Sequence, residues 1–158
     1  MSSTAPRDQF KAVCELLDSA LRLYFEGEAD FAALHLSGAA EELLGNLLRA
    51  RDCTPVLDNL QDVMMKAWTL LSTDDLLLMD GATMSPKAIA EVMNRARNHV
   101  KHSTQAATYD ARSEARDMLE RALLNYRHLL NEGAPLPAPS ELMQRFDHEF
   151  FERITNAE

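Results

Sequence analysis

The groups in this chain that are best suited to chemistry lie in one short polar run, Arg97-Asn98-His99-Val100-Lys101-His102. A histidine side chain can take up or release a proton near neutral pH, because its unperturbed pKa is about 6.5. A guanidinium can bind a phosphate through two hydrogen bonds and stabilise negative charge that develops on it. These two groups together could cleave RNA without a metal. His102 would transfer a proton at the 2′-hydroxyl or the leaving 5′-oxygen, and Arg97 would hold the scissile phosphate.

The same run also has a purely structural interpretation. On a helix, with roughly 100° per residue, Asn98 and His102 share one stripe, and Arg97 lies on the next stripe together with Lys101. The core side is marked by nearby apolar residues, namely Ile89, Val92, Met93, Ala96 and Val100. The run would then be a solvated last turn whose cations complement the helix dipole. The residues alone leave both interpretations open.

A second candidate group lies earlier in the chain, where two glycines flank a pair of carboxylates, Glu41 and Glu42. Gly38 and Gly45 share one helical face with Glu42. A glycine inside a helix costs about 1 kcal/mol relative to alanine. The two glycines therefore predict that another backbone approaches closely and that Glu42 is at least partly buried. One interpretation is close helix packing beside a solvated acidic pair. The other is a carboxylate that orients or neutralises a cation from another helix, with Arg97 as the candidate.

Apolar residues recur at helical spacing along most of the chain, and no strand-like alternation persists. The predicted helices cover residues 8–26, 28–51, 55–71, 86–103 and 110–130, with one further turn around residues 75–79. Thr54-Pro55 and Ser85-Pro86 are each typical of a capping residue followed by proline at the first helical position. We therefore predict an all-α, up-and-down bundle of four to five helices over residues 1–132. A stiff proline-rich linker (133–139) and a C-terminal helix (140–158) follow, and this helix packs either on the bundle or on a partner subunit.

The composition bounds the fold and the partners. With 158 residues, 46% of them hydrophobic, the chain is long enough for one domain with one core. Its net charge of −9 opposes binding to duplex DNA, so any nucleic-acid contact must be local. Residues 87–102 form the one basic island of the sequence. We expect a cytoplasmic protein without membrane contact, because no apolar run approaches the ~20 residues of a span and the first residues show no signal pattern.

Residues 97–102 resemble the motif of the HEPN superfamily, in which an arginine, usually followed by a polar residue, precedes a histidine by a few positions. Asn98 after the arginine and Lys101 before the histidine match frequent members of that family. In architecture the resemblance covers most of the chain, since these proteins are bundles of about four long helices with the motif on a late helix. Glu41 or Glu42 is a weaker match to an acidic position on an earlier helix.

This resemblance implies a homodimer in which two Arg/His motifs line one basic cleft that takes RNA or a nucleotide. Many such proteins are metal-independent endoribonucleases of toxin-antitoxin or defence type, and some work beside a nucleotidyltransferase-like or antitoxin partner. By this resemblance His102 is the acid and base, Arg97 the phosphate ligand and Asn98 a positioning residue. The supporting residues are Glu42 or Glu41, Lys101 and His99.

Other classes of protein are disfavoured by residue spacing. A di-metal carboxylate bundle needs Glu-x-x-His pairs, and the residue three before each histidine is never a carboxylate. His99 and His102 could share a metal, but no third ligand has a recognisable spacing. Cys14 and Cys53 are expected to be ordinary buried thiols, so we predict no metal and no cofactor. A helix-turn-helix over residues 85–102 would lack a well-formed supporting helix. The remaining competitor is a non-catalytic interaction module in which the Arg/His cluster is structural.

Overall fold

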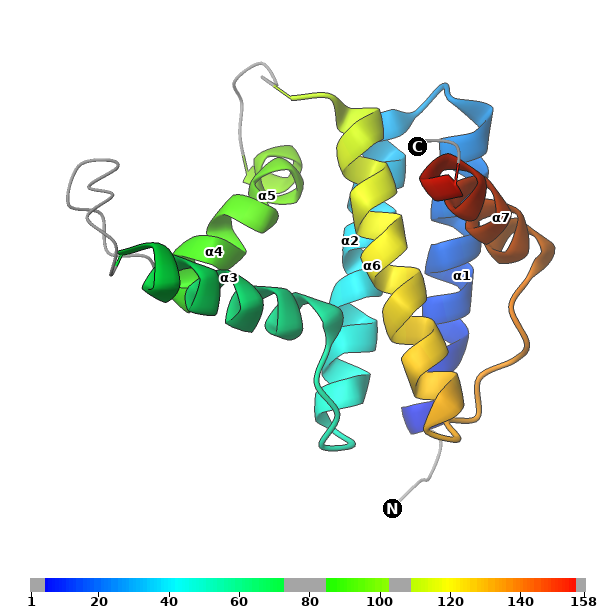
Figure 1. Ribbon diagram of the computed structural model, residues 1–158. Helices are drawn as coiled ribbons and strands as arrows, with labels where there is room; N and C mark the ends of the chain where they lie inside the picture. Colours follow the sequence, from blue (N-terminus) through cyan, green and yellow to red (C-terminus); the bar gives the residue numbers. More distant parts are fainter. Residues whose placement is uncertain (1–4, 73–84, 103–108, 156–158) are drawn as a thin grey trace.

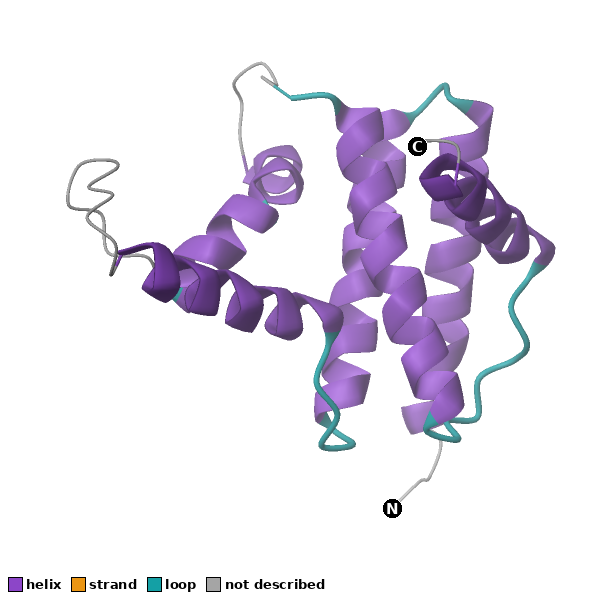
Figure 2. Cartoon of the chain, viewed as in Figure 1, coloured by secondary structure: helices purple, strands orange, loops and turns teal. Residues whose placement is uncertain are grey.

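The structure is a computed structural model that describes residues 5–72, 85–102 and 109–155. Within these ranges the chain forms helices and connecting loops, without a strand (Figure 2). The helices are α1 (Ala5–Glu26), α2 (Asp30–Arg49), α3 (Val56–Ser72), α4 (Pro86–Met93), α5 (Arg95–His102), α6 (Ala111–Asn131) and α7 (Glu141–Thr155). The predicted all-α class is confirmed for this part of the chain, whereas the helices outnumber the four to five expected. Each described helix is too short or too polar to cross a lipid bilayer. The turn predicted around residues 75–79 lies outside the described residues.

An additional helix arises because the long helix predicted from Pro86 onwards is divided at Asn94. This residue has φ −107° and ψ 8°, in the region that bridges helical and extended backbone. Its side-chain oxygen accepts a hydrogen bond from Arg121 Nη2 of α6 at 3.3 Å. α5 then runs in a different direction from α4 (Figure 1). At the start of α4 the predicted cap is confirmed, because Ser85 Oγ accepts a hydrogen bond from Ala88 N at 3.1 Å.

The core lies between α1, α2 and α6, which run alongside one another (Figure 1). α2 and α6 point in the same direction, so their C-terminal ends lie at the same end of the bundle. Small side chains without exposed surface allow these two helices to approach closely, namely Ala33, Ala40, Ala115 and Ala122. α3 runs across these helices rather than along them, which departs from the predicted up-and-down order.

The proline-rich linker leads from the end of α6 to α7, which packs on α1. Tyr126 Oη of α6 donates a hydrogen bond to Pro137 O at 2.7 Å and so ties the linker to the bundle. In α7, Phe146 is only 2% exposed. Its ring makes T-shaped contacts with Tyr24 and Phe25, at centroid distances of 5.6 and 6.4 Å. α7 therefore contributes to the core of its own chain.

Tyr126 makes the stability of the fold sensitive to alkaline pH. Its side chain is 1% exposed, and burial, followed by the neighbouring Cys14 and Asp18, raises the pKa of its hydroxyl. An unfolded tyrosine ionises near pH ~10, so the folded state holds this proton more tightly than the unfolded state does. The stability that this difference contributes is fully present below pH about 10 and is lost as the pH rises further.

Raising the pH from ~9 to ~11 is expected to lower the free energy of unfolding of the wild type by about 1 kcal/mol more than that of Tyr126→Phe. Urea unfolding followed by circular dichroism at each pH measures this difference. Tyr24→Phe, which removes the hydroxyl of another buried tyrosine, is the control. The same pH dependence in the wild type and in Tyr126→Phe would show that Tyr126 does not cause the alkaline loss.

Candidate functional site

The candidate site is built on α5, a short amphipathic helix that packs on α2 and α6. Ala96 is 4% exposed and belongs to the core, and Val100 packs against that core. Arg95 and Asn98 are exposed. The expected core side is therefore confirmed at Ala96 and Val100, but it is wrong at Val92 of α4, which is 64% exposed. α5 consequently presents polar groups to solvent while its apolar side is held by the bundle.

The structure places the backbone of the predicted catalytic pair within α5. The side chains of Arg97, Lys101 and His102 lie outside the part that the structure describes, so their orientation and their pairing stay predictions. Asn98, the predicted positioning residue, is exposed. Its backbone N–H donates to Asn94 O at 2.9 Å, which continues the helix across the break.

His99 packs against a tyrosine that sequence reasoning missed. Tyr109 Oη donates a hydrogen bond to Ala96 O at 3.0 Å and lies 3.5 Å from His99 Nδ1. The two rings meet edge to face at 5.4 Å, and Phe31 at the start of α2 lies 6.4 Å from the tyrosine ring. Burial raises the pKa of Tyr109 and so favours the protonated hydroxyl that donates this bond. His99 therefore helps to attach α5 to the bundle, and no local motif around Tyr109 signals this contact.

The structure distinguishes the two candidate carboxylates of α2. Glu41 is 3% exposed, whereas Glu42 is exposed. The expectation that Glu42 is at least partly buried is therefore wrong, and the choice between Glu41 and Glu42, which the sequence left open, falls on Glu41 for burial. Both residues lie three or four positions from Gly38 and Gly45, so the glycines alone cannot choose between them. Tertiary packing around α2 makes the choice, because it covers Glu41 and leaves Glu42 exposed.

Both carboxylates border a polar pocket of about 200 Å³ between α2, the first turn of α3 and the junction of α4 and α5. It is lined by Glu41, Glu42, Gly45, Arg49, Leu57 and Asn94. Arg49 donates hydrogen bonds to both carboxylate oxygens of Asp58, at 2.9 and 2.7 Å, and this pairing raises the pKa of Arg49. The predicted acidic position and the helix of the Arg/His motif thus lie on adjacent, directly packed elements.

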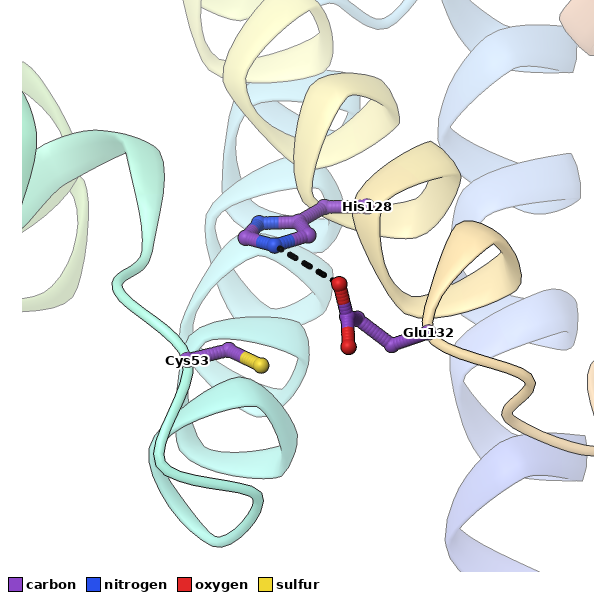
Figure 3. A group of neighbouring side chains, drawn as sticks. All are labelled: Cys53, His128 and Glu132. Atoms are coloured by element: carbon purple, nitrogen blue, oxygen red, sulfur yellow. Dashed lines mark ion pairs between the residues drawn. The ribbon is translucent and has the colours of Figure 1, made fainter.

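A second cluster of reactive side chains lies beyond the C-terminal end of α2. Potential metal-ligating atoms of Cys53, His128 and Glu132 all lie within 4.8 Å of one another (Figure 3). Sequence reasoning does not reveal this cluster, because Cys53 is expected to be an ordinary buried thiol and the ligand spacings weighed above, Glu-x-x-His and His99 with His102, do not include it. His128 lies in the last turn of α6 and Glu132 is its C-cap, four residues later, a spacing that places both on one side of the helix end and was present in the sequence. The arrival of Cys53 beside them depends on the fold.

No family model, no curated protein and no solved structure matches this chain. The resemblance of residues 97–102 to the HEPN motif therefore rests on those residues and stays a prediction. Function has to be inferred from the chemistry and placement of the side chains described above.

Proposed function

We propose that this protein is a HEPN-like, metal-independent endoribonuclease of toxin-antitoxin or defence type, in which α5 binds and cleaves RNA. His102 acts as the general acid and base, Arg97 holds the scissile phosphate, and Asn98 positions them. The observation that carries the proposal is the packing of α5 on α2. This contact brings a helix with three cationic residues and no carboxylate next to the helix that bears the buried Glu41.

The charge distribution supports a contact with RNA that is confined to α5. The chain as a whole carries a net charge of −9, which repels a polyanion. Arg95, Arg97 and Lys101 concentrate positive charge in one helix, and the exposed Arg95 and Asn98 show that part of this helix faces solvent. Phosphate contacts of this kind supply most of the affinity of a nucleic-acid-binding surface.

Glu41, rather than Glu42, fills the acidic position of the proposed site. A carboxylate that is 3% exposed has lost most of its hydration, and such a group is stabilised by a charged hydrogen-bond donor. Glu41 lines the polar pocket together with Asn94, the residue immediately before α5. In this role Glu41 orients the cationic helix and does not touch the substrate.

The proposed site is composite, with two copies of the chain pairing so that their α5 motifs line one cleft. Support for pairing comes from an apolar surface on α3, α4 and α6. Its side chains are between 36% and 64% exposed, namely Leu60, Val63, Met64, Val92 and Leu124. Three of them, Leu60, Val92 and Leu124, border a groove of about 460 Å³. Exposed apolar side chains that gather in this way are typical of protein contacts. A nucleotidyltransferase-like or antitoxin partner would be a further occupant of such a surface.

The second candidate function is a non-catalytic interaction module. One observation favours it: His99, in the middle of the Arg/His cluster, is engaged in a packing contact with Tyr109. If the rest of the cluster is equally structural, the apolar surface of α3, α4 and α6 carries the function by binding another protein.

Cleavage of a mixed RNA pool in EDTA separates the two functions. We expect the wild type to cleave, and His102→Ala and Arg97→Ala each to lose at least about 100-fold in rate, the smaller end of what general acid–base catalysis contributes. His148→Ala, which removes an exposed histidine of α7, is the matched control and should cleave at the wild-type rate. Circular dichroism verifies that each variant is folded.

The opposite outcome is equally specific. If the wild type is inactive at high protein concentration, with a dimer verified by analytical ultracentrifugation, the ribonuclease proposal fails. Loss of RNA cleavage in His148→Ala to the same degree as in His102→Ala would also contradict the assigned roles. A dimer that neither cleaves nor binds RNA would leave the interaction module as the function.

A further inference from the structure

Three side chains of different chemistry converge at the end of the bundle where α2 and α6 terminate. Cys53 supplies a thiol, His128 an imidazole and Glu132 a carboxylate, and their ligand atoms lie within 4.8 Å of one another. Glu132 Oε1 is 3.8 Å from His128 Nε2. In Figure 3 the side chain of Cys53 points from the loop after α2 towards the other two residues on α6. The cluster thus joins two elements that are distant in the sequence.

The backbone holds Cys53 in place through the way α2 ends. Asp52 has a positive φ of 57°, Asp52 N donates to Arg49 O at 3.1 Å, and Cys53 N donates to Leu48 O at 3.0 Å. This combination is a Schellman motif, which reverses the chain and satisfies the last carbonyls of the helix. Cys53 is therefore fixed by main-chain hydrogen bonds. Its Sγ makes a weak hydrogen bond to Arg51 O at 3.4 Å, which a thiolate would give up on binding a metal.

The end of α6 is fixed in the same way. Gly133 has a φ of 73°, Gly133 N donates to Leu130 O at 3.0 Å, and Ala134 N donates to Leu129 O at 2.9 Å. Glu132 is the residue immediately before this glycine, one helical turn after His128. The imidazole of His128, the carboxylate of Glu132 and the thiol of Cys53 are thus presented by rigid helix ends, as a binding site requires.

The electrostatic environment favours a cation at this place. The C-terminal end of a helix carries a partial negative charge, and the C-terminal ends of α2 and α6 lie at the same end of the bundle (Figure 1). The side chain of His128 is 38% exposed and that of Glu132 is 50% exposed. An ion can therefore reach the cluster from solvent, and water can complete its coordination.

The arrangement suits a metal better than a nucleophilic thiol. In a Cys-His-acid relay the base uses one ring nitrogen for the thiol and the other for the acid. Glu132 instead approaches Nε2 of His128, on the side of the ring that faces Cys53 in Figure 3. Zinc binds sulfur at about 2.3 Å and nitrogen or oxygen at about 2.0–2.2 Å, so tetrahedral ligand atoms lie about 3.5 Å apart. Small rotations of the three side chains would bring their ligand atoms from the observed separations to this tetrahedral spacing.

We propose that Cys53, His128 and Glu132 form a binding site for a divalent transition-metal ion of the zinc class, with water in the fourth position. A thiolate and an imidazole select such an ion over magnesium or calcium, which prefer oxygen ligands. The bound ion clamps the C-terminal ends of α2 and α6 together. None of these three residues belongs to α5 or lines the pocket beside Glu41. The metal site is therefore separate from the proposed RNA site.

Cobalt(II) is the probe, because its spectrum identifies the ligands. The reduced, metal-free full chain is titrated with cobalt(II). We expect one equivalent to bind, with a thiolate-to-cobalt charge-transfer band and the visible bands of tetrahedral cobalt, and zinc to displace it. Cys53→Ser should abolish the charge-transfer band. His128→Gln and Glu132→Gln should each weaken binding at least about 10-fold, since even groups that only hydrogen-bond to a metal ligand contribute that much.

The chain offers matched controls for both ligand types. His148 and Glu152 of α7 form the same four-residue pair, 3.7 Å apart, so His148→Gln removes an equivalent imidazole at a different place. Cys14→Ser removes the other thiol. Both controls should bind cobalt as the wild type does.

Two results would overturn the metal site. The first is the absence of a thiolate-to-cobalt band from the wild type at one equivalent, which is decisive even if a variant fails to fold. Alternatively, His148→Gln or Cys14→Ser could reduce binding as much as His128→Gln or Cys53→Ser does, which would make the binding adventitious. Since the RNA assay is run in EDTA, failure of either proposal leaves the other testable.

Discussion

Replacing Phe146 by alanine is expected to lower the free energy of unfolding by about 3–5 kcal/mol, the usual cost of deleting a buried phenylalanine side chain. Phe146 is 2% exposed, and its ring packs edge to face against Tyr24 of α1 at 5.6 Å. The substitution therefore removes one of the two α7 side chains, Met143 being the other, that are buried in the core. Urea unfolding of the wild type and of Phe146→Ala, followed by circular dichroism, measures the difference.

Phe31→Ala is the matched control for this change. Phe31 is 51% exposed, so its truncation should cost less than about 1 kcal/mol. If both variants lose the same amount, Phe146 does not hold α7 on the bundle. If the loss in Phe146→Ala instead depends on protein concentration, then α7 packs on the partner subunit in solution rather than on its own chain.

Replacing Asn125 by leucine is expected to lower the free energy of unfolding by about 1–3 kcal/mol, the cost of leaving a buried polar group without its hydrogen-bond partner. This loss is expected even though Asn125 has no exposed surface, a position where an apolar side chain is ordinarily favoured. Asn125 Oδ1 accepts a hydrogen bond from Val56 N, the first residue of α3, at 2.9 Å. A helix begins with backbone N–H groups that lack an intrahelical acceptor, and a side chain of α6 caps this one from a distance in the sequence. Leucine would leave the N–H of Val56 without that acceptor.

The same substitution at Asn131, which is exposed on the same helix, provides the comparison. Asn131→Leu should change the free energy of unfolding by less than about 0.5 kcal/mol. A stability of Asn125→Leu equal to or above that of the wild type would show that burying leucine outweighs the lost cap. Hydrogen exchange at the start of α3 would then report whether this helix end still forms.

The candidate site illustrates where sequence reasoning succeeds and where it fails. The core side of α5 followed from periodicity, and Ala96 is 4% exposed as that pattern predicts. The burial of Glu41 in place of Glu42 did not follow, because neighbouring residues on a helix differ by only about 100° and the packing partner selects one of them. The contact between His99 and Tyr109 also escaped prediction, since it joins a helix to a loop residue without any motif.

The break at Asn94 has a similar origin. Apolar spacing continues across this residue, so the sequence favours one uninterrupted helix. In the structure its side chain bonds to Arg121 of α6, a residue 27 positions further along the chain, and the helix divides into α4 and α5 there. The break sets the direction of α5 and thereby the position of the whole Arg/His cluster.

The sequence by itself determined that the described chain is helical and where most of its helices begin and end. These properties are local, because helical periodicity, caps and prolines act within a few residues. Only the tertiary structure decided that Glu41 is buried, that Asn125 caps α3, and that Cys53 meets His128. Those outcomes depend on how helices distant in the sequence pack together, and packing is a property of whole helix faces rather than of any single segment.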